Sequence, residues 1–189
     1  NVNNNRPIIG ILSQEPSKSI ASVSPESVSY IAASYVKWLE GQGARVVPIK
    51  VNQPDSYYKT EFDSINGLLI PGGGASLVSS GYGKAGSILY DLAIEANNNG
   101  DFFPVWGTCL GFELLLYLSA GRKNFLTPCN SYNRAASLKF ISGTIFTDRW
   151  PRRRTTTAWN SWPLSKRSII HFGACNSIRR RTSTNGVPI

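Results

Sequence analysis

The sequence predicts an α/β fold in three layers, in which helices cover both faces of a mainly parallel sheet. Apolar segments of strand length occur at 7–12, 44–49, 65–70 and 102–107, and they alternate with segments of helical periodicity. Strands that alternate with helices favour parallel crossover connections. In such sheets, ligands and chemistry gather beyond the carboxyl ends of the strands. We therefore look for a site in the turns that follow these segments.

Three helices are expected between and after these strands. Ser24, Pro25 and Glu26 have the order of an N-cap, a first-turn proline and an early acid, which predicts a helix from there to the glycines at 41–43. The second helix is marked by apolar residues at Ala85, Ile88, Leu89, Leu92, Ala93 and Ala96. The third begins directly after the strand at 102–107 and carries Leu110, Leu114, Leu115 and Leu118.

Composition indicates one globular domain and argues against several other classes. The chain has 189 residues, of which 41% are apolar, enough for a core of its own. It contains neither an apolar run near 18 residues nor a leader-like start, so no spanning helix is expected. The three cysteines at 109, 129 and 175 form no CxxC pair, which leaves room for one Cys129–Cys175 bridge and predicts no metal. The absence of methionine indicates a processed or partial chain.

The positive charge is confined to the last third of the chain. Residues 1–127 carry 9 basic and 10 acidic side chains, whereas residues 128–189 carry 11 basic and 1 acidic. We therefore expect an α/β domain at 6–147, incomplete at its C-terminus, and an atypical basic tail at 148–189. One interpretation of the tail is a nucleic-acid segment of arginines and tryptophans. The favoured one is a reading frame that departs near Phe146 and leaves a disordered or unselected tail, so no nucleic-acid partner is expected.

Cys109 is the strongest candidate for a catalytic residue. It stands in the sequence G-T-C-L-G, where a strand passes directly into a helix. Flanking glycines at this spacing permit the sharp turn on which hydrolases expose a nucleophile. The helix N-terminus favours negative charge on the sulfur, and the Leu110 amide lies where an oxyanion forms. The competing interpretation is an ordinary buried cysteine at the start of a helix.

Two glycine clusters require separate interpretations. The sequence P-G-G-G at 71–74 follows a strand, and it is either a flexible turn or the source of a second amide for the same oxyanion. The residues 81–86 match the pattern GxGxxG, which is typical of dinucleotide binding when it follows a strand directly. Here more than ten residues separate it from the strand, and no acid closes a following strand, so no nucleotide cofactor is expected.

Several segments together resemble a known family. RPIIGIL, YIAASYVKWLEGQGARVVPI, INGLLIPGGG and DFFPVWGTCLGFELL, in this order, are similar to γ-glutamyl hydrolases, peptidase family C26 of the class I glutamine amidotransferase-like superfamily. The resemblance implies a cofactor-free cysteine peptidase that cleaves γ-glutamyl bonds of folylpoly-γ-glutamates in lysosomes, vacuoles or outside the cell. It implies Cys109 as the nucleophile, Gly73 and Leu110 as oxyanion amides, and Tyr30 at the edge of the site.

This sequence departs from the family pattern at the catalytic base. The family supplies a histidine within an H-P-E sequence, but this chain has a single histidine, His171, in SIIHFG. One interpretation is that the apolar residues before it form a strand that brings His171 to Cys109 as the base; the favoured one is a histidine in a peripheral segment, because no acid in the tail can orient the ring. Three functions follow: an active hydrolase, which takes a base from this chain or from a second copy in a homodimer, an impaired fragment that only binds glutamyl ligands, or a glutamine amidotransferase domain.

Overall fold

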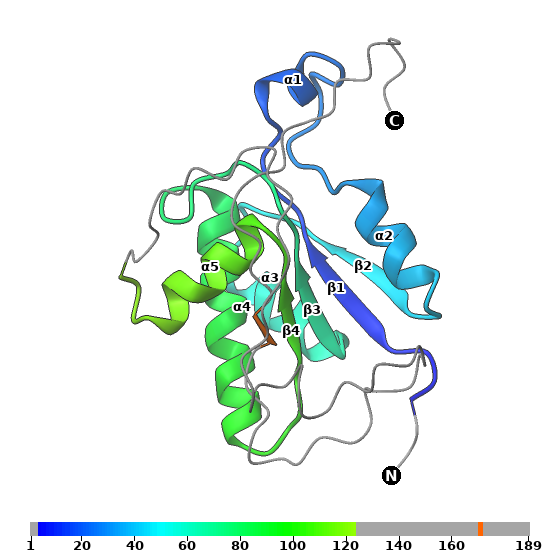
Figure 1. The fold of residues 1–189 in the computed structure, drawn as a ribbon, viewed down its shortest axis with the longest axis vertical. Coiled ribbons are helices and arrows are strands. Elements are labelled where there is room, and N and C mark those ends of the chain that lie inside the picture. The colour runs from blue at the N-terminus through cyan, green and yellow to red at the C-terminus, as the bar shows by residue number, and fades with distance from the viewer. Residues whose placement is uncertain (1–3, 124–169, 172–189) are drawn as a thin grey trace, which may run out of the picture. The chain divides into compact units, whose positions relative to one another are not determined.

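A computed structural model of the chain describes residues 4–123 and 170–171 (Figure 1). Five strands form one sheet within these residues: β1 Ile8–Leu12, β2 Arg45–Ile49, β3 Gly67–Ile70, β4 Val105–Gly107 and β5 Ile170–His171. The strand order is β2-β1-β3-β4-β5, and every neighbouring pair is parallel. The predicted parallel sheet is therefore confirmed. Cys129, Cys175 and the predicted boundary at 147/148 lie outside the described residues.

Among the described residues, four helices cover the two faces of the sheet: α2 Ala33–Glu40, α3 Asp55–Ser64, α4 Gly81–Asn98 and α5 Leu110–Ser119. The short helix α1 Lys18–Ala21 buries none of its residues and lies beyond the end of the strands in Figure 1. Helix α2 packs on β1 and β2 at one face, whereas α3, α4 and α5 lie together at the other, as Figure 1 shows. This division follows from right-handed crossovers, because the chain reverses its direction across the sheet after β2. The three-layer prediction is confirmed.

The main core lies between the sheet and helices α3 to α5. Helix α4 contributes Ala85, Leu89 and Ala93, which recur every four residues and are completely buried. Helix α5 adds Leu114 and Leu115, which are also completely buried. Full burial of one such leucine is worth about 2 kcal/mol. No helix among the described residues is long and apolar enough to cross a membrane.

The helix predicted from Ser24 begins only at Ala33, so this prediction was wrong at its start. Residues before it follow another path because Tyr30 and Gln14 pair as an isolated antiparallel bridge. Their backbones exchange two hydrogen bonds, of 3.1 and 2.9 Å. An α-helix would need the same backbone groups for its own bonds. Helix α3 was not predicted, because Tyr58 and Phe62 are its only buried residues and give a weak periodic signal.

The glycines of the GxGxxG pattern are explained by packing in helix α4. The carboxylate of Glu15 accepts hydrogen bonds from the Gly81 and Tyr82 amides at the start of this helix. A protein side chain therefore occupies the place where a phosphate would bind. A Cβ atom on Gly83 would lie 2.2 Å from the Leu77 carbonyl oxygen, so the close approach requires glycine.

Candidate active site

Cys109 lies between strand β4 and helix α5, at the carboxyl end of the sheet. Its backbone has φ 53° and ψ −113°, a left-handed conformation that is unusual for a residue other than glycine. The turn is held by its own backbone: the Gly111 amide donates to the Thr108 carbonyl at 2.9 Å and the Glu113 amide to the Cys109 carbonyl at 3.0 Å. The Cys109 side chain is partly exposed. A partly exposed thiol on a strained turn is accessible to a substrate.

The two glycines that flank Cys109 are required by close packing. A Cβ atom on Gly107 would lie 2.6 Å from the Gly111 carbonyl oxygen. A Cβ atom on Gly111 would lie 2.0 Å from the carbonyl oxygen of Ile70, at the end of strand β3. The first turn of helix α5 therefore sits directly on the neighbouring strand. This contact fixes where the helix starts and hence where the sulfur stands.

The loop at 71–74, which follows strand β3, lies beside Cys109. A Cβ atom on Gly72 would be 2.9 Å from the Cys109 Cβ and 3.0 Å from the Tyr35 hydroxyl. The Gly72 amide donates to that Tyr35 hydroxyl at 2.9 Å, and Gln14 Nε2 donates to the Gly72 carbonyl at 2.8 Å. The Tyr82 hydroxyl donates to the Pro71 carbonyl at 2.7 Å. Three side chains from distant parts of the sequence thus hold this loop.

The two predicted oxyanion amides belong to these two turns. Leu110 is the first residue of helix α5, and a first-turn amide has no acceptor within its own helix. Gly73 follows Gly72 in the loop and is exposed. Among the residues that the structure describes, no hydrogen bond uses either the Gly73 or the Leu110 amide. Both remain available to a developing negative charge.

Tyr30 and His171 both lie at the carboxyl end of the sheet. Tyr30 is bridged to Gln14, whose side-chain amide binds Gly72. His171 is the Cα partner of Gly107 in the parallel pairing of β4 and β5. The predicted strand before His171 is therefore present, and its last residue stands beside the strand that leads into Cys109. The catalytic roles of Tyr30 and His171 stay predictions.

The Tyr82 phenol is the most strongly shifted titratable group near Cys109. The side chain is completely buried, and this burial raises its pKa well above the usual range near 10. Smaller contributions in the same direction come from the charges of Tyr35, Cys109 and Glu113. Tyr82 therefore keeps its proton and remains a donor to the Pro71 carbonyl at any physiological pH.

Sequence reasoning missed Gln14, Tyr35 and Tyr82. Gln14 offered one signal, because it is a polar residue just after the first strand, at the edge where chemistry gathers. The structure buries it almost completely, at 2% exposure. Tyr35 lies within the helix that the sequence predicts, and Tyr82 lies within the GxGxxG pattern, so neither residue stands out. The hydroxyl groups of these tyrosines gave no signal of their own.

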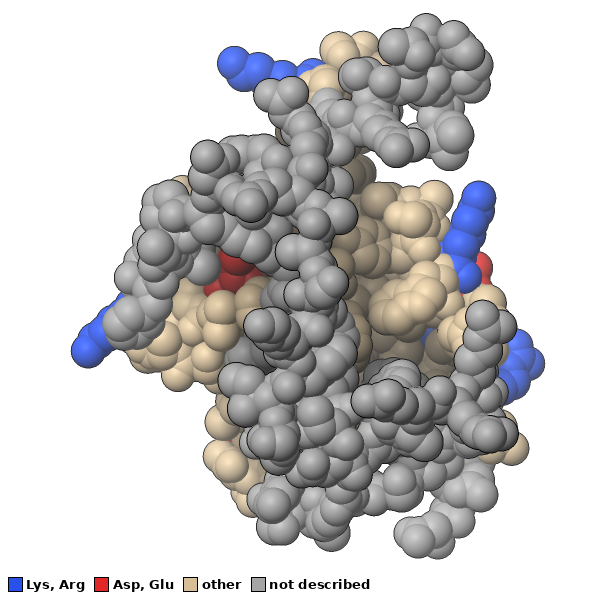
Figure 2. Space-filling model, viewed as in Figure 1, with Lys and Arg blue, Asp and Glu red and all other residues tan. Residues whose placement is uncertain are grey.

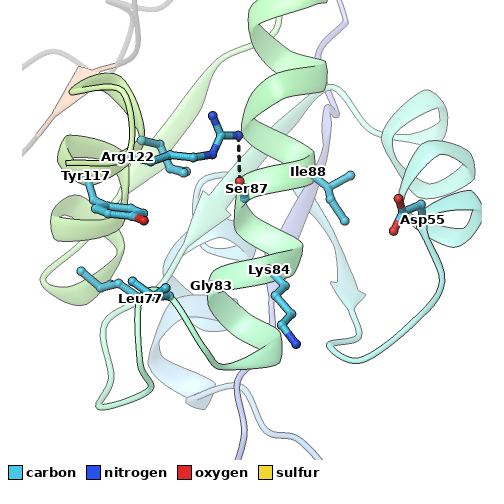
Figure 3. A pocket seen from close by; sticks show the side chains of 10 residues that line it. Asp55, Leu77, Gly83, Lys84, Ser87, Ile88, Tyr117 and Arg122 are labelled. Atoms are coloured by element: carbon cyan, nitrogen blue, oxygen red, sulfur yellow. Dashed lines mark hydrogen bonds between the residues drawn. The ribbon is translucent and has the colours of Figure 1, made fainter. Parts of the chain in front are cut away.

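A hollow whose lining does not include Cys109 lies between the loop at 77–78 and helices α3, α4 and α5 (Figure 3). It measures about 410 Å³ and is lined by both charges and apolar side chains, including Asp55, Lys84, Ile88 and Tyr117. Arg122 at its rim donates to Ser87 at 3.0 Å and to Asp91 at 2.6 Å. The part of the chain that the structure describes contains no cluster of three metal-ligating side chains.

A parallel α/β sheet with a partly exposed cysteine on a sharp strand-to-helix turn defines the class of α/β proteins that have an elbow of this geometry at the carboxyl end of the sheet. The family model for Peptidase C26 matches residues 7–124, and the chain belongs to this family.

The relatives are longer than this chain. Gamma-glutamyl hydrolase of Mus musculus is 42% identical over 87% of this chain and 54% of its own length. Gamma-glutamyl hydrolase of Rattus norvegicus is 49% identical over 71% of the chain and 41% of its own length. Gamma-glutamyl hydrolase of Homo sapiens is 45% identical over 74% of this chain and 43% of its own length. The chain thus matches about half or less of the length of these curated relatives.

Proposed function

We propose that this chain is a cysteine-type γ-glutamyl hydrolase that cleaves γ-glutamyl bonds of folylpoly-γ-glutamates through an acyl-enzyme on Cys109. The observation that carries the proposal is the partly exposed Cys109 on a left-handed turn, with Gly72 of the 71–74 loop against its Cβ. The similarity to gamma-glutamyl hydrolases supports a γ-glutamyl bond as the one that is cleaved. The folate part of the substrate rests on the family resemblance.

The mechanism follows from the position of the sulfur and the two amides. The Cys109 thiolate attacks the γ-carbonyl carbon, and the carbonyl oxygen becomes an oxyanion. The Gly73 and Leu110 amides donate to this oxyanion; one such donor is typically worth about 10²–10³ in kcat. The amine then leaves with a proton. Water attacks the thioester, which regenerates the thiol and releases the γ-carboxylate product.

His171 is the proposed base and acid in this sequence. It would take the thiol proton and return it to the leaving amine. The support is the register of the sheet, since His171 pairs with Gly107, two residues before Cys109. A side-chain imidazole is the group whose unperturbed pKa suits both proton transfers near neutral pH.

An impaired fragment that binds glutamyl ligands without turnover is the second candidate. It is favoured by the departure from the family pattern, since the sequence contains no H-P-E segment. It is also favoured by the single histidine and by the absence of Asp and Glu after Asp148, because no acid follows to orient an imidazole. A glutamine amidotransferase domain is a more distant alternative, and it would need a partner synthase for turnover.

The test is to incubate the full chain with pteroylpentaglutamate and to analyse both product and protein by mass spectrometry. We expect release of glutamate or glutamyl peptides and a thioester on Cys109, with Cys109→Ser giving neither. His171→Gln should lower kcat by about 10²-fold or more if His171 is the base. No glutamate release, together with alkylation of Cys109 at an ordinary thiol rate, would leave the binding fragment as the better description.

Location and assembly are also proposed from the resemblance. We place the chain in a lysosome, a vacuole or the extracellular space, to be checked by fractionation of cells that express it. A homodimer is to be checked by sedimentation. Nucleic acid is not proposed as a partner: on the face shown in Figure 2, the Lys and Arg side chains of the described residues stand apart from one another.

A further inference from the structure

The loop at 71–74 contains three successive glycines, yet its first two peptide units are tied to the body of the protein. Glycine has the largest backbone freedom of any residue, so a triple-glycine loop has many conformations to lose on folding. The ties come from Gln14 after strand β1, Tyr35 of helix α2 and Tyr82 of helix α4. Helices α2 and α4 lie on opposite faces of the sheet, and Gln14 lies at the carboxyl end of strand β1.

The first of the two peptide units is held at both of its ends. A trans peptide unit is planar and consists of one carbonyl and the amide that follows it. The unit between Pro71 and Gly72 offers its carbonyl to the Tyr82 hydroxyl at 2.7 Å. Its amide donates to the Tyr35 hydroxyl at 2.9 Å. The Gly72 amide is thereby used, and it has no further proton to give to a substrate.

The second peptide unit is held at its carbonyl alone. Gln14 Nε2 donates to the Gly72 carbonyl at 2.8 Å. The Gly73 amide belongs to the same planar unit and points away from that carbonyl. Fixing the carbonyl therefore fixes the direction of the Gly73 N–H. The same glutamine packs on Gly73, where a Cβ atom would fall 1.6 Å from Gln14 Oε1.

We infer that Tyr35 and Gln14, supported by Tyr82, are positioning residues that present the Gly73 amide to the oxyanion. Tyr35 takes the Gly72 amide out of use, and Gln14 orients the next peptide unit. The inference rests on the proposed function for its catalytic meaning. Its structural content, the orientation of one amide beside Cys109, is measurable without turnover.

The first experiment compares Tyr35→Phe with Tyr58→Phe in the full chain. Tyr58 is the matched control, because its hydroxyl also accepts a backbone amide, that of Gln53 at 3.1 Å, while it belongs to helix α3. Each substitution removes one oxygen and leaves one amide unpaired, so the two should cost similar stability. We expect Tyr35→Phe to lower kcat by about 10- to 100-fold with KM within about twofold. Tyr58→Phe should leave both constants within about twofold.

Gln14→Glu is the second variant, since it keeps the size of the side chain and replaces the donor by an acceptor. The carboxylate would repel the Gly72 carbonyl that Gln14 now binds. We expect the same pattern, a fall in kcat with little change in KM. A loss in KM alone, or equal losses for Tyr35→Phe and Tyr58→Phe, would overturn the positioning role even if the wild-type chain is a working hydrolase.

Two measurements decide the inference if the wild-type chain releases no glutamate. The first is the NMR chemical shift of the Gly73 amide, which reports its orientation and surroundings and should change in Tyr35→Phe and not in Tyr58→Phe. The second is binding of a peptide that ends in a glutamate γ-aldehyde. The Cys109 S–H adds across its carbonyl, with the proton going to oxygen, and the adduct should be about tenfold weaker in Tyr35→Phe. An unchanged Gly73 chemical shift and unchanged adduct affinity would refute the positioning role.

Discussion

Two turns at the carboxyl end of the sheet meet at the candidate nucleophile, and they are held in different ways. The turn at 108–111, after β4, is held by main-chain contacts: the Thr108–Gly111 hydrogen bond, the hydrogen bond from the Thr108 amide to the Ile70 carbonyl, and the close packing of Gly111 on Ile70. The loop at 71–74, after β3, is held by side chains at positions 14, 35 and 82. The first turn is fixed by main-chain contacts, whereas the second is held by side chains from three separate parts of the chain.

This difference has a consequence for how the two turns respond to substitution. A turn that is fixed by close main-chain contacts is strongly destabilised when one of its glycines is replaced or one of its backbone angles is changed. A loop held by separate side chains loses one hydrogen bond at a time, each worth about 1 kcal/mol. Substitutions at the first turn should therefore cost more stability than substitutions at the partners of the second.

The largest effect is expected for Gly111→Ala. Its Cβ would lie 2.0 Å from the Ile70 carbonyl oxygen, so backbone has to move. We expect a loss of about 3 kcal/mol in the free energy of unfolding, measured by urea denaturation. Gly74→Ala is the control, since a Cβ there meets nothing within 4 Å, and it should change stability by about 0.5 kcal/mol or less. Equal losses at the two positions would contradict the close seat of helix α5 on β3.

A smaller effect is expected at Cys109 itself. Its φ of 53° is costly for any residue with a Cβ and easily adopted by glycine. Cys109→Gly should therefore be more stable than Cys109→Ala by about 1 kcal/mol, although both lack the nucleophile. The comparison of two inactive variants separates strain from chemistry. Equal unfolding free energies for the two would show that the turn stores no strain.

The same contrast explains what the sequence revealed of the site. Cys109, Leu110 and their flanking glycines lie within five consecutive residues, so their spacing alone predicts a turn of this kind. Tyr35 is 37 residues from its partner Gly72, and Tyr82 is 11 residues from its partner Pro71; at these separations no local pattern indicates a hydrogen bond to the loop. The start of helix α2 was missed for the same reason, because Tyr30 is paired with the distant Gln14.

The sheet itself was predictable because its strands are short apolar runs between turn residues. Their order, β2-β1-β3-β4-β5, was not predicted, because right-handed crossovers relate the face of each helix to the strand order without determining that order. Strand β5 has only two residues, and its pairing with β4 depends on a partner more than 60 positions away in the chain. Helix α3 carried too few apolar residues to be recognised, although its buried Phe62 stacks on Phe103.

The smallest effect is expected for Tyr82→Phe, and its sign changes with pH. Near neutral pH the variant loses the bond to the Pro71 carbonyl and should be less stable by about 1 kcal/mol. Burial raises the folded-state pKa of Tyr82 above its unfolded value of 10.0, so the unfolded chain releases this proton first as the pH rises. The stability that wild type gains from Tyr82 is therefore present below pH 10 and is lost progressively above it.

The phenylalanine variant cannot take part in that loss, because it has no proton to release at this position. The stability gap between wild type and Tyr82→Phe should close above pH 10 and then reverse, by up to about 1.4 kcal/mol per pH unit. Urea denaturation at several pH values between 7 and about 11 measures the gap. Burial also raises the pKa of Tyr58 and Tyr90, so only the difference between the two proteins isolates Tyr82. A gap that stays constant across this range would mean that the hydroxyl holding the 71–74 loop is open to water.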